Sequence, residues 1–388
     1  MRTRVDWVLP ASMLIGTFAW SFVYVSLPFH IQKVSPLDPA ATLRWTGWIL
    51  GISPLITVVT APISGRIGEH VDPKRGFIAV QALQGLGFLG MALARTLPEM
   101  LVARMLLGLM GAVSTFAFIM VGRSGGDVRR QVSHIQSGMT LGQVLGPAAG
   151  AIVAARVGFR LSFILGAFML WACSALVSWG VPPGKAAAAG AAGERRISLR
   201  ELVTVSLVVL AGSTQVFFLT SILPQILPPL GVPLESTLEI GGFLILTTGV
   251  AASLGAMAAP RLADLLGDRR AVRWFLVGSS VFLASLTAAG NVWSFGLLRF
   301  LQVLCIAPVF PLSVAAIAQR ASGEAIGFVN SARIGAAFIG PVLATTLLSS
   351  MPPAAVYLVL AGLGLSVVPL VARLDRRSRL RELPQGEA

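Results

Sequence analysis

Twelve apolar runs, each long enough to cross a bilayer as a helix, divide this chain of 388 residues. A spanning helix needs about 20 mainly apolar residues. The runs have approximate limits at residues 7–30, 44–67, 77–96, 99–121, 134–156, 159–182, 202–229, 236–262, 272–291, 294–318, 324–349 and 353–373. Only 12% of the residues are charged, about half the share in soluble domains. The sequence therefore predicts an all-α integral membrane protein with twelve transmembrane helices.

The first run occupies the position of a secretory signal. It extends from about Trp7 to Phe29, behind Arg2 and Arg4, and shows no small-residue cleavage pattern. Its length suits a spanning helix better than the short apolar region of a signal peptide. We expect this run to remain as the first transmembrane helix.

Lysine and arginine residues gather in the loops of one side. If the N-terminus is cytoplasmic, the outer loops receive only Lys33, Arg44, Arg95, Arg156 and Arg160. Apart from three arginines inside the runs, all other lysines and arginines fall on the cytoplasmic side. Membrane proteins show this bias towards the cytoplasm, so both termini are expected there. The net charge of +14 would also suit a nucleic-acid partner. We reject that interpretation because the arginines lie in short turns between apolar runs.

Four landmarks recur about 195 residues further along the chain: Pro28 and Pro224, Arg66 and Arg261, Arg104 and Arg299, and Pro147 and Pro341. Each half holds six spans, so both copies face the membrane in the same direction. Parallel repeats of this kind are typical of secondary transporters, whose site lies between the halves near the bilayer midplane. We expect six-helix bundles at residues 1–182 and 202–388, joined at 183–201 by a basic cytoplasmic linker rich in small residues.

The chain resembles the major facilitator superfamily over essentially its whole length. The family's first-loop motif is matched by Gly65, Glu69-His70 and Lys74-Arg75, with Asp72-Pro73 where a second glycine and a basic residue are usual. Arg104, Gly108 and Gly111 resemble the arginine motif of the fourth helix, and Gly138, Gly142, Gly146-Pro147 and Gly150 resemble the fifth-helix motif of drug-exporting antiporters. The resemblance implies a twelve-helix drug/proton antiporter-type exporter in the inner membrane of a bacterium, which we expect to be monomeric.

Two charged turns at matching positions are candidates for a cytoplasmic latch between the halves. The first contains Gly65, Arg66, Glu69, Lys74 and Arg75, and the second contains Arg261, Asp264, Gly267, Arg269 and Arg270. An acidic side chain there could bind a helix N-terminus, which stabilises by roughly 0.3–1 kcal/mol, or an arginine. The alternative is a solvated, positively charged loop. Because the second turn is the more regular copy, we expect it to carry at least as much of the latch as Glu69.

Glycines at four-residue intervals mark the fifth run. On a helix, Gly138, Gly142, Gly146 and Gly150 share one face, which lets a neighbouring helix approach closely. Pro147 adds an expected kink. Tight packing alone and a gating role are both consistent with this pattern.

Charge inside the predicted spans is positive. Arg104, Arg299 and Arg333 fall within apolar runs, where ionisable groups are costly and usually functional. Structural bonding to carbonyl oxygens is the alternative for Arg104, and snorkelling for Arg333. All sixteen Asp and Glu residues lie in loops, tails or helix ends. We therefore predict neutral, amphiphilic or anionic substrates and not permanent cations.

Substrate-binding residues follow from the resemblance, because the family's cavity is lined mainly by helices one, four, seven and ten. Those helices supply Trp20, Tyr24, Arg104, Gln215, Phe218 and Gln302. A few polar groups on apolar walls suit a broad amphiphilic ligand. Protons are a possible coupling partner, and the candidate residues are His30, His134 and loop carboxylates such as Glu69.

No nucleotide loop, metal cluster or paired nucleophile motif is present in the sequence, so we expect neither an enzyme nor a cofactor. Two alternatives to an exporter stay open. One is a metabolite or sugar permease with the same fold, and the other is a transporter-like sensor that does not move solute.

Overall fold

The computed structural model describes residues 2–110, 113–122, 128–182, 198–318 and 323–382. Inside these ranges the side chains of 2–6, 61–62, 64–70, 122, 128–130, 132–133, 260, 263, 268, 315–318, 323–326 and 374–382 are not described. Among the sites predicted above, the side chains of Arg66 and Glu69 thus lie outside the described set, as do Gly65 and most of the expected linker.

Twelve helical spans are long and apolar enough to cross a membrane, as the twelve runs predict. The first six consist of α1 (Arg2–Tyr24) with α2 (Leu27–Val34), α3 (Pro39–His70), α4 (Pro73–Leu93), α5 (Leu97–Leu109) with α6 (Val113–Gly122), α7 (Val128–Val157) and α8 (Phe159–Gly180). The last six consist of α9 (Leu199–Phe217) with the short helices η1 (Leu219–Ile222) and α10 (Leu223–Ile226), α11 (Thr237–Leu266), α12 (Asp268–Ser285), α13 (Val292–Ile306) with α14 (Val309–Ala318), α15 (Gly323–Leu348) and α16 (Pro353–Glu382).

The helix breaks repeat along the chain. The first span breaks just before Pro28, and the seventh breaks just before Pro224. A proline lacks a backbone N–H, which removes one bond from the helix ladder and favours a kink or a break. The fourth and tenth spans also divide at matching places, after Leu109 and after Ile306. The duplicated landmarks thus mark duplicated bends.

The two charged turns are much shorter than the sequence indicates. Helix α3 continues to His70 and α11 to Leu266, beyond the expected limits of 67 and 262. Only two residues therefore separate α3 from α4, and only one separates α11 from α12. In the first turn the Asp72 side chain accepts the Lys74 N–H at 3.0 Å, which caps α4. In the second turn Gly267 adopts φ +79°, which favours glycine. Asp72-Pro73 and Gly267 are therefore two local solutions to the same sharp reversal.

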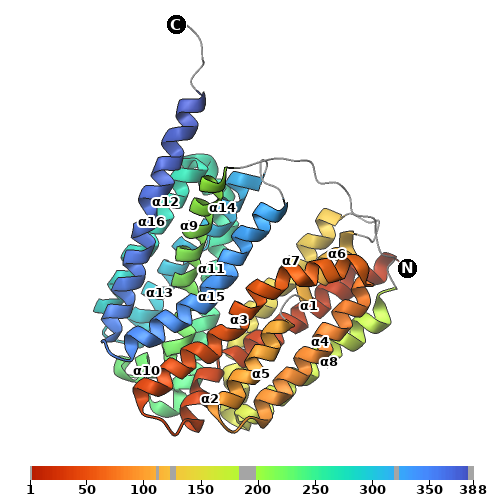
Figure 1. Ribbon diagram of the computed structural model, residues 1–388. Coiled ribbons are helices and arrows are strands. Elements are labelled where there is room, and N and C mark those ends of the chain that lie inside the picture. Colours follow the sequence, from red (N-terminus) through yellow and green to blue (C-terminus); the bar gives the residue numbers. More distant parts are fainter. Residues whose placement is uncertain (1, 111–112, 123–127, 183–197, 319–322, 383–388) are drawn as a thin grey trace, which may run out of the picture.

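The spans form two six-helix bundles, α1–α8 and α9–α16 (Figure 1). The bundles contact each other mainly through two helix pairs, α3 with α15 and α7 with α11. In Figure 1 they meet at the end where α2 and α10 lie, which we name the closed end. They diverge towards the end where α1 begins and α16 finishes, which we name the open end.

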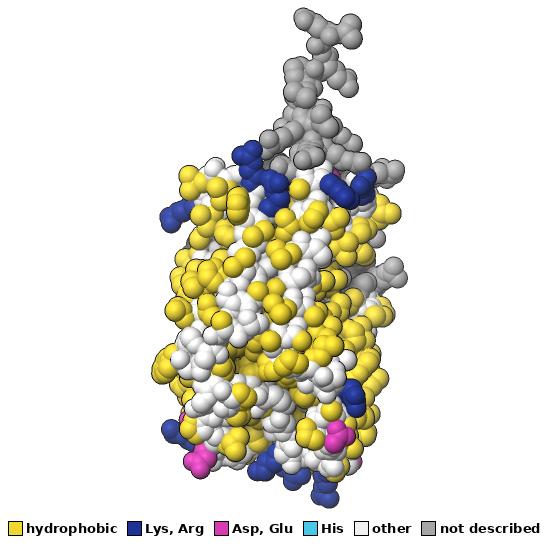
Figure 2. Space-filling view, turned by 90° about the vertical axis from the view of Figure 1, so that its left-hand side faces the viewer, with side chains coloured by type: hydrophobic (Ala, Val, Ile, Leu, Met, Phe, Trp, Pro, Cys, Tyr) yellow, Lys and Arg dark blue, Asp and Glu magenta, His cyan; other side chains and the backbone are white. Residues whose placement is uncertain are grey.

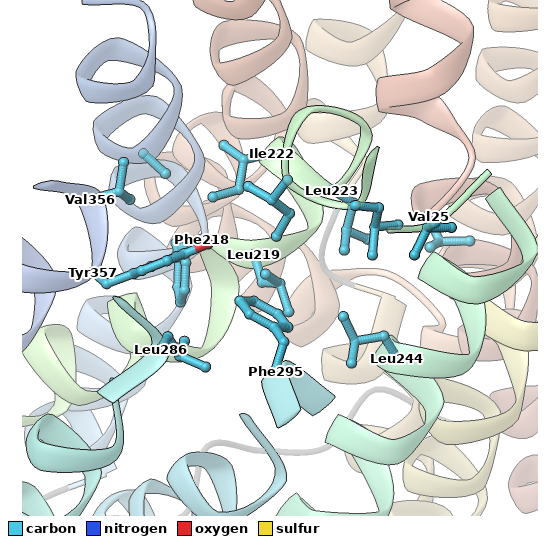
Figure 3. Packing of buried hydrophobic residues seen from close by; sticks show 14 of the residues in the cluster. Val25, Phe218, Leu219, Ile222, Leu223, Leu244, Leu286, Phe295, Val356 and Tyr357 are labelled. Atoms are coloured by element: carbon cyan, nitrogen blue, oxygen red, sulfur yellow. The ribbon is translucent and has the colours of Figure 1, made fainter. Parts of the chain in front are cut away.

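An extensive buried apolar cluster joins the bundles at the closed end (Figure 3). Val25 comes from the link between α1 and α2, and Leu223 of the other bundle lies beside it. The cluster continues to Phe218 and Tyr357, whose ring centres are 6.3 Å apart. Its members therefore bury apolar surface of both bundles at this end.

The surface agrees with a transmembrane orientation of the bundles. Figure 2 shows hydrophobic side chains over the middle of the face formed by the second bundle and charged side chains at both ends. Trp7, Trp179, Trp274 and Trp293 are largely exposed near helix ends, where interfacial tryptophans gather in membrane proteins.

Candidate functional site

A cavity of about 480 Å³ lies between the bundles. Helix α7 supplies the wall from the first bundle, and α9, α11, α13, α14 and α15 supply the wall from the second. The α7 lining runs from Gln136 to Val144, in the half of that helix nearer the open end. The cavity is therefore placed on the open side of the molecule, with the closed end beyond it.

The lining is mainly apolar, with a few polar groups and one charged side chain among the described residues. It consists of Gln136, Thr140, Gln143, Val144, Val209, Gly212, Ser213, Val216, Phe217, Gly249, Ala252, Ser253, Ala256, Ile306, Ala307, Val309, Phe310, Pro311 and Arg333. Pockets for drug-sized molecules have this volume and this composition.

Arg333 lies in this lining and not at the lipid surface. This placement favours a residue of the cavity wall over a side chain that snorkels along the lipid. Its Nε donates a hydrogen bond to Oδ1 of Asn330, one turn earlier on α15, at 3.2 Å. The guanidinium carbon lies 5.0 Å from the ring centre of Phe310 on α14, a distance suited to a cation–π contact. Asn330 and Phe310 together fix the guanidinium at the cavity wall.

Arg104 bonds to a helix that a proline has locally opened. Residue 54 is proline, so the Leu50 carbonyl has no N–H four residues later to accept. Nη2 of Arg104 donates to that carbonyl oxygen at 2.9 Å, and Nε donates to the Ile49 carbonyl oxygen at 3.0 Å. The rings of Trp20 and Tyr24 lie 5.6 and 5.8 Å from the guanidinium carbon. In the described chain, Nη1 has no hydrogen-bond partner and is not fully buried.

Arg299, the repeat counterpart of Arg104, is fully enclosed. Its two terminal nitrogens each donate at 2.8 Å to the carbonyl oxygens of Gln215 and Val216, in the last turn of α9. Such carbonyls lack intrahelical partners and favour a cation. Nη1 also donates to Gln302, whose side chain continues through Ser279 to the Gln215 amide. Arg299 is thus the centre of a buried polar network inside the second bundle, although its Nε has no hydrogen-bond partner in the described structure.

The six predicted substrate-binding residues separate into two groups. Trp20 and Tyr24 surround Arg104 in the first bundle, whereas Gln215, Phe218 and Gln302 are buried with Arg299 in the second. The lining of the cavity described above includes none of these six. Their role in substrate binding stays a prediction.

Sequence reasoning overlooked the polar face of α7. Gln136, Thr140 and Gln143 recur at intervals of four and three residues, so they share one side of the helix. That side is opposite to the glycine face, and it lines the cavity. This spacing is present in the sequence, but the resemblance implies a cavity lined mainly by helices one, four, seven and ten.

The glycine face of α7 packs directly on α1, as its spacing predicts. A Cβ atom on Gly138 would lie 2.5 Å from the Pro10 carbonyl oxygen, and one on Gly142 would lie 2.5 Å from the Leu14 carbonyl oxygen. Further along, a Cβ on Gly146 would lie 2.8 Å from the Phe18 carbonyl oxygen, and one on Gly150 would collide with the Phe22 carbonyl. The contacts recur every four residues on both α7 and α1, so the two backbones stay close together over about three turns.

Glycines also allow the bundles to meet. A Cβ on Gly51 of α3 would lie 2.8 Å from the Phe338 ring of α15, and one on Gly242 of α11 would lie 3.0 Å from the Pro147 carbonyl oxygen of α7. Trp48 adds an edge-to-face contact with Phe338 at 5.5 Å between ring centres. Pro147 therefore lies at the contact between bundles as well as in the glycine motif.

The predicted latch residues that the structure describes lie at the open end. Lys74 Nζ donates to the Ser178 carbonyl oxygen at 2.8 Å, within the first bundle. Arg269 forms an ion pair at 3.4 Å with Glu201 at the start of α9, a partner that the sequence did not suggest. The side chains of Arg75, Arg261, Asp264 and Arg270 are exposed. A latch between the bundles stays a prediction.

Of the two histidines considered for proton coupling, only His134 is exposed. The His30 ring packs against Phe159 and Phe163, with ring centres 5.1 and 5.5 Å away. Both nitrogens of His30 are buried without a hydrogen-bond partner in the described structure. This environment is apolar, which suits a packed side chain better than a solvated proton relay.

A family model described as Major Facilitator Superfamily matches residues 9–252 and 205–388. Relatives include a protein named uncharacterized MFS-type transporter YuxJ of Bacillus subtilis, 25% identical over 82% of this chain and 83% of that protein. Another is named multidrug resistance protein MdtG of Citrobacter koseri, 24% identical over 89% of this chain and 88% of the relative.

Solved structures share the fold. The nucleoside transporter NupG has a TM-score of 0.75 at 10% identity, covering 96% of this chain and 99% of that one. The human organic anion transporter MFSD10 has a TM-score of 0.70 at 17% identity, covering 95% and 99%. A D-xylose–proton symporter has a TM-score of 0.72 at 14% identity, covering 94% and 96%. At these identities the likeness shows the fold alone.

Twelve spans, two similar bundles and a cavity between them thus accompany a sequence match that extends over both halves. Members of the matching family are transporters and not enzymes. The chain belongs to the major facilitator superfamily and is a multi-pass membrane protein of the secondary transporter class.

Proposed function

We propose that this protein exports small neutral, amphiphilic or anionic compounds across the cytoplasmic membrane of a bacterium by alternating access. The observation that carries the proposal is the cavity lining, which is mainly apolar and includes one cation and no carboxylate among the described residues. Apolar walls favour amphiphilic compounds. A fixed positive charge disfavours a permanent cation because like charges repel in a medium of low dielectric constant.

Export requires that the cavity open towards the cytoplasm in one of its states. The lysine and arginine bias predicts cytoplasmic termini, and the cavity lies on the side where the first helix begins. A compound arriving from the cytoplasm or the inner leaflet could then enter this state. The relatives named for multidrug resistance agree with export.

A sugar permease is the second candidate, because a D-xylose–proton symporter shares the fold. Sugars carry many hydroxyl groups, each of which needs a hydrogen-bond partner when it leaves water. The described lining offers only a few polar side chains, from Gln136, Thr140, Gln143, Ser213 and Ser253, besides the arginine. The cavity therefore favours an amphiphile over a sugar.

Counterflow in proteoliposomes tests the proposal. Purified protein is reconstituted with unlabelled chloramphenicol inside, and the entry of labelled chloramphenicol, a neutral amphiphile, is followed. Transient accumulation is expected, and the same assay with ethidium, a permanent cation, should show none. Proton-dependent movement of ethidium would overturn the substrate assignment. Absence of counterflow for neutral, anionic and cationic solutes alike would favour a sensor.

Coupling to protons is the exchange that the resemblance implies, and we include it in the proposal. An imposed pH gradient should then drive accumulation of a neutral substrate and move charge across the membrane. If transport does not depend on the pH gradient and moves no net charge, proton antiport is excluded. The proposed substrate class would still stand.

A further inference from the structure

Arg333 differs from the other two membrane arginines in what its terminal nitrogens contact. Its Nε donates a hydrogen bond to Asn330, and the guanidinium packs against the ring of Phe310. Its Nη1 and Nη2 have no hydrogen-bond partner in the described chain, and neither is fully buried. Two parallel N–H donors are thus held at the wall of the cavity and remain available.

A cation at this place favours an anionic partner over a neutral one. A charged side chain within the membrane is costly unless it is paired or solvated. The described lining has no carboxylate to pair with it, and the Asn330 amide supplies a dipole but no charge. A bound solute is then the natural source of the negative charge.

The geometry of the donors selects the kind of anion. A planar guanidinium presents paired N–H groups that match the two oxygens of a carboxylate. A phosphate dianion would keep a net negative charge against a single arginine, whereas a carboxylate is neutralised. The remainder of the lining, including Val209, Val216 and Ile306, is apolar. It suits an uncharged hydrophobic body attached to that carboxylate.

We propose that Arg333 binds the carboxylate of an amphiphilic monoanion through Nη1 and Nη2, and so makes organic monocarboxylates the preferred substrates. This inference rests on the proposed function and narrows it. The opposite wall comes from α7 of the other bundle, where Gln136, Thr140 and Gln143 offer amide and hydroxyl groups. A solute that fills the cavity would therefore contact both bundles at once.

A matched pair of fluorescent probes isolates the contribution of the charge. Dansylglycine carries a carboxylate, and dansylglycinamide has the same shape without the charge. Binding to the purified protein is followed by dansyl fluorescence, and transport is followed in proteoliposomes. We expect the acid to bind about tenfold to a hundredfold more tightly than the amide, since a hydrogen bond to a charged group has a net value in that range.

Substitutions then place the preference on Arg333. Arg333→Gln should weaken binding of the acid by about the same factor and leave the amide unchanged. Arg333→Lys should retain part of the preference, since lysine keeps the charge but loses the paired donors. Arg44→Gln, an exposed arginine at the far end of α3, is the control and should retain the full preference.

The outcomes separate this inference from the broader proposal. Equal binding of acid and amide by the unmodified protein, or a preference that survives Arg333→Gln, overturns the role of Arg333. If the amide is still transported, export of amphiphiles stands without it. If the acid binds through Arg333 but neither probe is transported, the binding site stands and the proposed transport of such compounds fails.

Discussion

Arg104 and Arg299 occupy equivalent positions in the two repeats but have different surroundings. Arg299 is sealed in the network of Gln215, Gln302 and Ser279. Arg104 keeps one terminal nitrogen without a partner in the described chain, beside Trp20 and Tyr24. The arginine thus occurs in both repeats, but its contacts differ between the two bundles. Of the pair, Arg104 is the better placed for a role beyond stability.

Replacing Arg299 with methionine is expected to destabilise the protein more than it alters substrate choice. The substitution leaves the Gln215 and Val216 carbonyl oxygens and the Gln302 side chain without their donor. Each buried group left unsatisfied costs about 1–3 kcal/mol. Thermal unfolding of the detergent-solubilised protein should show a clear decrease in Tm. An unchanged Tm combined with an altered ratio of transported substrates would contradict this structural role.

At the scale of whole helices, the α1–α7 pair combines a predicted feature with one that the sequence concealed. Four-residue glycine spacing predicted a close approach, and the backbone contacts of Gly138 to Gly150 agree with it. The spacing could not identify α1 as the partner, because periodicity defines a face and not what covers it. The opposite face, with Gln136 and Gln143, is equally periodic, and its place in the cavity wall becomes visible only when the second bundle is placed against it.

Gly142→Ala should destabilise the protein. Its new Cβ would lie 2.5 Å from the Leu14 carbonyl oxygen and 2.7 Å from the Phe18 backbone nitrogen, so α1 must move away. Gly362→Ala on α16 is a matched control, because a Cβ atom at this position would have no neighbouring atom within 4 Å. Alanine has a higher helix propensity than glycine, by about 1 kcal/mol, so this control should not destabilise the protein. Comparison of Tm values checks the pair. Equal effects of the two substitutions would show that the close contact with α1 contributes little.

At the scale of the molecule, the number of spans and the presence of two bundles were predictable because both depend on apolar length and on repeat spacing. The end at which the bundles meet was not predictable. It depends on contacts such as Gly51 with Phe338 and Val25 with Leu223, which join residues far apart in sequence. The tightness of the charged turns was also missed, since Asp72 and Gly267 act through local geometry and not through hydropathy.

A cross-link between the bundles tests whether their relative motion is required. Cβ atoms at Gly249 on α11 and Val144 on α7 would lie 3.5 Å apart, within the range that a disulfide needs. In a protein with Cys173 and Cys305 replaced by serine, Gly249→Cys combined with Val144→Cys is expected to cross-link under oxidation and to stop counterflow. Reductant should restore it, and each single cysteine should be insensitive to oxidant. Undiminished counterflow in the fully cross-linked protein would exclude separation of α7 from α11 as a transport step.

The apolar cluster at the closed end has a thermal consequence. If transport opens that end, side chains such as Val25, Leu223 and Phe218 become hydrated, and hydration of apolar surface carries a large positive heat-capacity change. The free energy that favours closure then varies with temperature in a curved manner and weakens on cooling. The balance between the two states is therefore expected to shift in the cold towards the state in which this end is open. The temperature dependence of transport is expected to deviate from a straight Arrhenius line even where the lipid remains fluid.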